Sequence, residues 1–389
     1  LQNKINRNRI KYLSFYFNIL MVDYFTRTIH EKRSASGLDS VARQKGEELM
    51  TTSIGITRAH TNIALIKYWG KENKELFIPM NSSLSLTLEA FYTDTKVELS
   101  DTLTEDEFYL NGAKQDEAAI AKITRFLDLF RAETGDSRRA RVESLNFVPT
   151  AAGLASSASA FAALAGAMNE ATGLNMPAQK LSTYARRGSG SATRSLFGGF
   201  VEWNKGDSNE NSMAIPVDDA NFDIGMIIIV VSAAEKKISS RAGMELTVST
   251  SPFYEGWVTS AATDLADIKE AIKDRDIHRI GSIAEFNGMK MHATMLASNP
   301  PFCYFEPESI IAQQTIRTIR EERGIPAYFT MDAGPNVKVI CKASDIPAIL
   351  EELGKVFPSE KLIPTLPGEG IRTLTEDEWN ASRAAFEGK

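Results

Sequence analysis

The sequence predicts an α+β protein with two domains. Its 389 residues are enough for two domains that each bury a sizeable core. Segments rich in β-forming residues alternate with helical patterns, but without the regular strand–helix–strand rhythm of a doubly wound sheet. Apolar residues make up 43% and charged residues 24% of the chain, which is ordinary for a globular protein.

Three segments read as strands. Thr95–Ser100 alternates polar and apolar residues, as a half-buried strand does. The run Gly225–Ser232 is mostly Ile and Val, so it predicts a central strand. Val337–Cys341 alternates again and predicts a third strand.

Helices are predicted between the strands. Glu117–Glu133 carries apolar residues at helical spacing, and Gly135 ends it. Ala155–Thr172 consists almost wholly of apolar or small residues, which predicts a buried helix. Three further helices are expected at Glu255–Lys273, Glu308–Arg323 and Asp345–Phe357.

Composition excludes several functions. The net charge of −6 predicts no general attraction to nucleic acid or anionic lipid, so an anionic ligand must be held by local positive groups. The two cysteines, Cys303 and Cys341, lack metal-binding spacing, and the four histidines are scattered. We therefore expect no structural disulfide, no zinc site and a reducing, cytoplasmic location.

Residues 1–49 differ in character from the rest. Basic residues precede the apolar run Tyr12–Phe25, as in a signal peptide, but Asn18 and Asp23 interrupt the run and no small-residue cleavage site follows. The run is also too short and polar for a membrane span. We expect residues 1–49 to be translated upstream sequence, a non-native or disordered extension, because Lys45–Met50 can be encoded by a ribosome-binding sequence and a start codon.

The stretch Pro149–Ala160 predicts a phosphate site. Gly153 lets the backbone approach a ligand, and Ser156, Ser157 and Ser159 fall where a helix begins and leaves its N–H groups unpaired. The stretch matches neither a Walker loop nor GxGxxG. The alternative is a Ser/Ala-rich helix start that packs against a sheet, since serine is a good cap in any case.

Three more segments carry a resemblance. They are Arg58–Lys71 with Pro79–Leu88, then Arg186–Gly199, and then Thr330–Val337 with its Asp-Ala-Gly-Pro-Asn run. Together with the serine stretch, and in this order, they resemble the diphosphomevalonate decarboxylase family, a branch of the GHMP small-molecule kinases. The resemblance runs from about Thr52 to the C-terminus.

The resemblance implies the two-domain GHMP fold. Its N-terminal domain is of the ribosomal protein S5 domain 2-like kind, and its C-terminal domain is ferredoxin-like. We place the boundary near Asn221, which gives an ATP-binding domain over 50–221 and a C-terminal domain over 222–389. The resemblance also implies a homodimer.

The family's reaction is the ATP-dependent decarboxylation of mevalonate 5-diphosphate to isopentenyl diphosphate. The tertiary C3 hydroxyl is phosphorylated, phosphate departs, and the neighbouring carboxylate is lost as CO2. This chemistry requires a carboxylate at the hydroxyl, cations around the phosphates and a dry pocket.

Asp332 is the candidate for that carboxylate, although a turn Asp that bonds its own backbone is the alternative from spacing alone. Lys67 lies among apolar residues and either snorkels or is paired in a cleft. The family position favours a cleft, in which Lys67 would pair with Asp332.

The resemblance assigns the remaining substrate contacts. Arg194 is expected to bind the substrate carboxylate in a bidentate fashion, although a surface arginine after a Gly/Ser turn is the alternative. Substrate-binding positions are also expected at Tyr68, Asn62, Lys71, Ser189 and Ser191.

ATP is expected at the serine stretch. The residues expected to bind it are Gly153, Leu154, Ala155, Ser156, Ser157 and Ser159. Ser156 and Ser157 are also candidates for contact with Mg2+, which neutralises the phosphates.

Some residues keep two interpretations. Ser239–Met244 is either a mobile lid over the nucleotide or a solvated basic turn. His292 is expected to pack in the interior, and Arg186 and Arg187 are expected to be surface charges. Two other functions stay open: a related GHMP kinase acting on mevalonate or a monophosphate without loss of CO2, and a silent binding protein.

Overall fold

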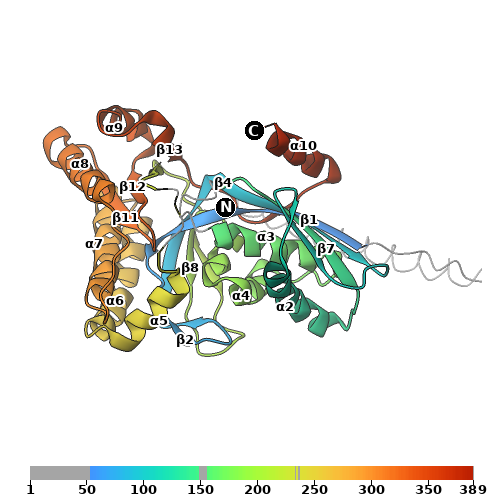
Figure 1. Cartoon of the computed structure of the whole chain (residues 1–389). Coiled ribbons are helices and arrows are strands. Elements are labelled where there is room, and N and C mark those ends of the chain that lie inside the picture. The colour runs from blue at the N-terminus through green and yellow to red at the C-terminus, as the bar shows by residue number, and fades with distance from the viewer. Residues whose placement is uncertain (1–52, 149–155, 233, 235–236, 389) are drawn as a thin grey trace, which may run out of the picture. The chain divides into compact units, whose positions relative to one another are not determined.

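The computed structural model describes residues 53–148, 156–232, 234 and 237–388. The predictions for residues 1–49 and for Gly153, Leu154 and Ala155 therefore lie outside the described residues. Figure 1 shows the α+β fold that the sequence predicts, with two separate sheets and helices packed on both.

The first sheet has the order β14-β1-β4-β7-β5-β6, and β8 and β9 extend it from β4. Its strands are β1 (Ser53–Ile66), β4 (Ser83–Ser100), β5 (Glu107–Leu110), β6 (Ala113–Lys114), β7 (Arg139–Asn146), β8 (Phe200–Trp203), β9 (Ala214–Asp218) and β14 (Arg372–Thr373). Between β1 and β4 lies a separate hairpin of β2 (Lys71–Asn73) and β3 (Ile78–Pro79).

Strands β1 and β4 form a long antiparallel pair, and their register shifts twice, between His60 and Asn62 and between Ala64 and Ile66. Such irregularities bend a strand and redirect its side chains. They lie in the half of β1 that leads to Lys67.

Helices cover both faces of the first sheet. One face packs under α2 (Glu117–Thr134), α3 (Ser156–Ala171) and α4 (Ala178–Gly188). Helix α3 lies very close to β1, because a Cβ on Gly55 would meet the Ala167 carbonyl oxygen at 2.0 Å. On the opposite face, Trp379 of α10 (Glu376–Glu387) packs with Ile56 and Leu145.

The second sheet is antiparallel throughout, in the order β11 (Ala327–Met331), β12 (Val337–Cys341), β10 (Gly225–Ile229), β13 (Leu362–Thr365). Because side chains alternate along a strand, Met226 and Ile228 face a core shared with α6 (Tyr254–Lys273), α7 (Ile277–Leu296) and the far ends of β1 and β4. Ile227 and Ile229 face α8 (Pro307–Arg323) and α9 (Ile346–Leu353).

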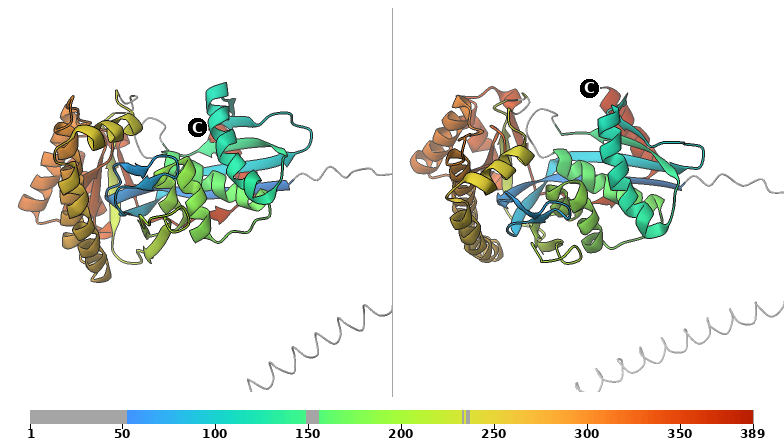
Figure 2. Two further views of the ribbon diagram at one scale, coloured as in Figure 1. Left: turned by 90° about the horizontal axis from the view of Figure 1, so that it is seen from below. Right: turned by 60° about the horizontal axis from the view of Figure 1, so that its bottom comes forward.

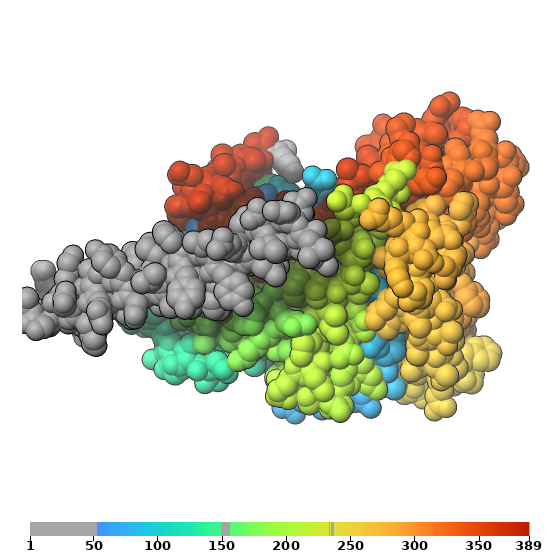
Figure 3. Space-filling model, turned by 180° about the vertical axis from the view of Figure 1, so that it is seen from behind, coloured from blue at the N-terminus to red at the C-terminus, as the bar shows by residue number. Residues whose placement is uncertain are grey.

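The views from other sides agree with this arrangement. Figure 2 shows α6 and α7 side by side against the second sheet. In the space-filling view of Figure 3, the orange and red residues of α7 to α9 form one block, while α10 lies apart from them over the first sheet. The last strand, β14, pairs with β1, so the end of the chain returns to the first sheet. The predicted boundary near Asn221 falls between β9 and β10, and the division into two domains stays a prediction.

Several predicted elements are confirmed within a residue or two. Val337–Cys341 is a strand, and the helix from Glu117 ends with Gly135 at a φ of 73°. The buried helix spans Ser156–Ala171 among the described residues. Two predictions were too long. The strand from Gly225 ends at Ile229, and the helix predicted over Asp345–Phe357 spans only Ile346–Leu353, because the chain turns at Gly354.

Helix α5 (Ser240–Thr250) begins within the segment Ser239–Met244, for which two interpretations were open. The hydroxyl of Ser239 accepts a hydrogen bond from the Ala242 N–H and so caps the helix.

Within the described residues, no helix combines the length and the apolar character that a membrane span requires.

Candidate active site

Lys67 follows directly on the end of β1, and its side chain is 2% exposed. Its main chain is held on both sides, because its N–H donates to Asn287 Oδ1 at 2.9 Å and its carbonyl accepts from Asn81 Nδ2 at 3.0 Å. The ammonium donates to the Ala64 carbonyl at 2.7 Å. A Cβ at Gly288 of α7 would lie 3.1 Å from Thr330 Oγ1, which is a tight contact, and 3.5 Å from Lys67 Cε, which is an ordinary one.

Asp332 follows β11 and faces two lysines. Its Oδ1 lies 2.7 Å from Lys67 Nζ, and its Oδ2 lies 3.3 Å from Lys338 Nζ. Burial alone would raise the pKa of Asp332, but the two ammonium groups outweigh it and hold this pKa well below its usual range. The Asp332 side chain is 26% exposed, so part of it remains open to a ligand.

Burial lowers the pKa of Lys67 to about 8, although Asp332 acts in the opposite direction. Lys67 is therefore mostly protonated at neutral pH and loses its charge as the pH rises past about 8. The ion pair that we expected between Lys67 and Asp332 is present in the structure.

Arg194 lies in the short 3₁₀ segment η1 (Gly190–Leu196) and is 2% exposed. Its Nε donates to Ser85 Oγ at 2.9 Å and to Asn62 Oδ1 at 3.3 Å, and its Nη1 donates to the Ser83 hydroxyl. Burial lowers its pKa to about 10. No carboxylate among the described residues forms an ion pair with Arg194, so a buried cation is available to an anionic group.

Asn62 supports Arg194. Its amide nitrogen donates to the Ser191 carbonyl at 3.0 Å and to Ser195 Oγ at 2.8 Å, while its oxygen accepts from Arg194. The predicted substrate contact of Asn62 therefore competes with three bonds already made within the protein.

Serine hydroxyls connect the start of α3 with η1. Ser157 Oγ lies 3.1 Å from Ser189 Oγ, which in turn lies 3.2 Å from Ser191 Oγ. Ser157 is exposed and Ser156 is half-buried at the first turn of the helix, whereas Ser159 is buried and bonds Thr93 Oγ at 2.8 Å. The first two hydroxyls can therefore reach a ligand, while Ser159 ties α3 to β4.

Tyr68 follows Lys67 directly and packs beside η1, because a Cβ on Gly190 would lie 3.0 Å from its ring. Its ring packs on Trp203, with the ring centroids 4.7 Å apart, and its buried hydroxyl has no hydrogen-bond partner among the described residues. Burial raises the pKa of Tyr68, while the charges of Arg194 and Arg241 act against this. The hydroxyl is thus a donor placed near two arginines.

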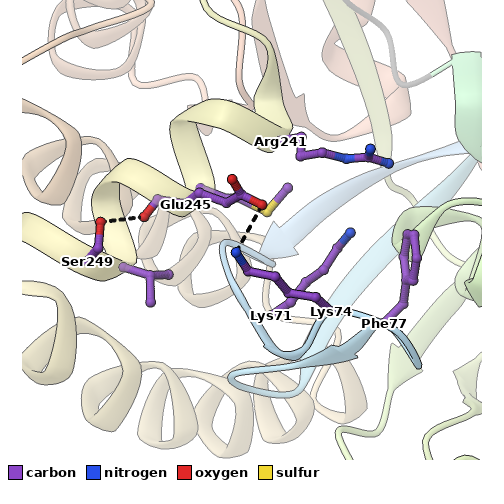
Figure 4. Close-up of a pocket in the computed structure, with 8 residues that line it drawn as sticks. Lys71, Lys74, Phe77, Arg241, Glu245 and Ser249 are labelled. Carbon is purple, nitrogen blue, oxygen red and sulfur yellow. Dashed lines mark hydrogen bonds and ion pairs between the residues drawn. The ribbon is translucent and has the colours of Figure 1, made fainter.

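The pocket lies between the β2–β3 hairpin and α5 and has a volume of about 300 Å³. Figure 4 shows Arg241 of α5 reaching toward the hairpin side, on which Lys71, Lys74 and Phe77 lie. Lys71 Nζ lies 3.5 Å from the Phe77 ring centroid, and burial, aided by Arg241, lowers the pKa of Lys71 to about 8. The pocket is therefore cationic and only partly screened from water.

Two further residues with a predicted position, His292 and Arg186, are both buried. His292 is 1% exposed and its Nε2 lies 3.4 Å from the Met331 carbonyl oxygen, so the prediction of a packing role is confirmed. Burial lowers its pKa to about 3. Arg186 was expected on the surface, which is wrong. It is fully buried and donates to the Leu76 and Ser212 carbonyls and to Asn209, and thereby fixes two loops.

Sequence reasoning missed Lys338. It is fully buried on β12 and contacts Asp332. A single lysine within Val-Lys-Val-Ile-Cys, a strand that is otherwise apolar, was the available signal.

These features agree with the resemblance to the GHMP class of ATP-using small-molecule enzymes: two sheets with helices, serines at the first described turn of a helix, and buried cations beside it. Comparison with known proteins makes the assignment specific. Residues 59–214 match the family model of the diphosphomevalonate decarboxylase-like N-terminal domain, and residues 226–383 match the mevalonate 5-diphosphate decarboxylase C-terminal domain.

Individual proteins agree with the family models. The chain is 34% identical to diphosphomevalonate decarboxylase of Bos taurus, over 83% of this chain and 86% of that protein. A structure of the mevalonate diphosphate decarboxylase from Enterococcus faecalis is 51% identical, covers 83% of this chain and 99% of its own, and superposes with a TM-score of 0.79. A second structure, named MDDEF and in complex with MVAPP, AMPPCP and magnesium, is 52% identical with the same coverage and TM-score. The chain belongs to the diphosphomevalonate decarboxylase family.

Proposed function

We propose that this protein catalyses the ATP-dependent decarboxylation of mevalonate 5-diphosphate to isopentenyl diphosphate, CO2, ADP and phosphate, within the mevalonate pathway of isoprenoid synthesis. The observation that carries the proposal is the Lys67–Asp332 contact beside Arg194, a buried cation without a carboxylate partner among the described residues.

The chemistry assigns a task to each group. Asp332 accepts the proton of the C3 hydroxyl while the terminal phosphoryl of ATP is transferred to that oxygen. Lys67 stabilises the charge that moves at C3, and Arg194 binds the substrate carboxylate. Phosphate then leaves with the electron pair of the C3–O bond, and the pair of the C1–C2 bond forms the C2=C3 double bond as CO2 departs.

The diphosphate suits the pocket at the hairpin. Lys71 and Arg241 supply positive charge there, and the Tyr68 hydroxyl, which has no hydrogen-bond partner among the described residues, feels the charges of Arg194 and Arg241. The proposal assigns the substrate carboxylate to Arg194 and the C3 hydroxyl to Asp332.

ATP and Mg2+ fit the start of α3. The described residues include no cluster of three or more His, Cys, Asp or Glu side chains that could hold a metal ion. Mg2+ prefers hard oxygen ligands and keeps much of its coordination from phosphates, so the hydroxyls of Ser156 and Ser157 at a helix N-terminus suit a metal–nucleotide complex. When bound, this complex supplies the phosphoryl group and neutralises its charge.

The test is to measure CO2 and ADP together from mevalonate 5-diphosphate and ATP. We expect one CO2 for each ADP. A stable phosphorylated product with ADP but no CO2 would identify a related kinase instead, and the absence of ATP turnover with mevalonate and both of its phosphates would identify a silent binding protein.

The family resemblance also supports a homodimer and a cytoplasmic location, and both are included in the proposal. Light scattering on the purified protein is expected to give the mass of two chains. Fractionation of the source cells is expected to recover the protein with cytoplasmic markers.

A further inference from the structure

Lys338 is the strongest feature that the proposed reaction does not use. Its side chain is fully buried at the middle of the second sheet, opposite Thr330 of β11 and Ile228 of β10. Residues opposite one another share a face of a sheet, so Lys338 lies on the face that Met226, Ile228 and Ile340 make apolar. A lysine is costly in such surroundings unless its charge is paired.

The hydrogen-bond and ion-pair partners of the Lys338 ammonium both lie in the loop between β11 and β12. Its ammonium donates to the Asn336 carbonyl at 3.2 Å and lies 3.3 Å from Asp332 Oδ2. Asp332 is the one carboxylate with which Lys338 forms an ion pair among the described residues. The other oxygen of that carboxylate is bound to Lys67 at 2.7 Å. The two lysines come from different sheets and hold different oxygens of one group.

We propose that Lys338 is a positioning residue for the decarboxylation: it fixes the second oxygen of Asp332, so that the carboxylate keeps one orientation and Lys67 keeps one partner. This inference rests on the proposed function. Each carboxylate oxygen has two acceptor sites, so both lysines leave room for the substrate hydroxyl.

A purely structural role does not explain the charge. Replacing a buried ionic group by an apolar residue of similar size is often neutral or stabilising, and a methionine would continue the apolar face. Lys338 also places a second positive charge beside Lys67, and this charge lowers the pKa of Lys67. The charged and titratable groups around Lys67 are Asp332, Lys338 on β12, Arg194 on η1 and His292 on α7.

The test compares three variants of the full chain. Lys338→Met removes the charge at nearly the same volume, Lys338→Arg keeps a cation, and Ile340→Met alters packing two residues further along the same face. If Lys338→Met does not fold, Lys338→Gln replaces it. We expect kcat of the neutral variant to fall about tenfold or more, with KM for ATP within about threefold. Ile340→Met is expected to stay within about twofold of wild type, and Lys338→Arg between wild type and the neutral variant.

A second measurement, the pKa of Lys67, needs no substrate. Loss of a neighbouring positive charge favours protonated Lys67, so the pKa of Lys67 is expected to rise in the neutral variant when followed by NMR of 13C-labelled lysine. An unchanged pKa of Lys67, or equal losses of kcat in Lys338→Met and Ile340→Met, would overturn the proposal. A wild-type protein that releases no CO2 would contradict the proposed function alone, and the NMR titration would still decide the role of Lys338.

Discussion

The buried cluster around Asp332 and the open pocket at the hairpin contain similar groups in opposite surroundings. In the cluster, Lys67 and Lys338 are almost fully buried and share one carboxylate. In the pocket, Lys74 pairs with Glu245 across 3.2 Å, with both side chains at least half exposed. Charges out of water interact strongly, whereas exposed charges are screened. This contrast supports the proposal that the buried cluster carries out the chemistry and the pocket binds the substrate.

The largest expected effect concerns the cluster. Asp332→Asn removes the proton acceptor but keeps the shape of the side chain, so kcat is expected to fall by about 10²-fold or more. ATP binding, measured by calorimetry, is expected to stay nearly intact. Asp267→Asn, at an exposed position of α6, is the matched control. Turnover near the wild-type rate in Asp332→Asn would remove Asp332 from the mechanism.

Arg194→Ala comes second. A buried charge that loses its partner typically costs about 2–5 kcal/mol, which is expected here as lost kcat/KM for the mevalonate substrate. Arg125→Ala, an exposed arginine on α2, serves as control. A loss confined to ATP affinity would instead assign Arg194 to the nucleotide.

The pH profile separates the two regions at the level of single lysines. Lys67 acts in its protonated form, and its pKa is about 8, so kcat/KM is expected to fall about tenfold per pH unit above pH 8. The pKa of Lys71 is also about 8. The variant Lys71→Met tells the two lysines apart. If Lys67 is the titrating group, this variant is expected to keep the fall in kcat/KM above pH 8. If that fall disappears in the variant, the titrating group is Lys71.

Removal of pocket charge is expected to weaken binding more than turnover. Arg241→Ala should raise KM for the diphosphate substrate about tenfold and change kcat less than about threefold, because the pocket is partly open to water. The increase in KM is expected to shrink at high salt, as screening weakens the wild-type interaction. An equal fall in kcat would show that Arg241 acts at the reacting atoms.

The smallest effect is expected at the exposed Lys74–Glu245 pair. Exposed pairs contribute about 0–1 kcal/mol, so Lys74→Ala is expected to change kcat and KM by less than about threefold. Steady-state kinetics of this variant beside Arg241→Ala measures how steeply the importance of charge declines toward the mouth of the pocket.

Much of the fold could be predicted because the signals are local. The spacing of apolar residues and Gly135 give helix α2 within one residue, and the alternation at Val337 gives β12. The motifs led to Lys67, Arg194 and Asp332, which the fold brings together. The pairing of Lys67 with Asp332, which lie 265 positions apart, was expected from the family resemblance and not from the spacing of residues.

The sequence analysis failed mainly to predict which single charged side chains are buried. Arg186 stands beside Arg187 in an unremarkable polar run, yet carbonyl oxygens of distant loops surround it. The partners of Arg186 are distant in the sequence, and the run around it does not indicate them. Lys338 interrupts an apolar strand, and its ion-pair partner among the described residues lies in the nearby loop between β11 and β12, so its signal was local but was overlooked.

The two hydrogen bonds to the Lys67 main chain link the two sheets to each other. Asn287 belongs to α7 beneath the second sheet, while Asn81 precedes β4 of the first. Asn287 is anchored in turn by Asp264 at 2.7 Å, and Lys290 lies 2.6 Å from the same Asp264 oxygen. Separation of the two sheets would break these hydrogen bonds and displace the Lys67 ammonium from Asp332.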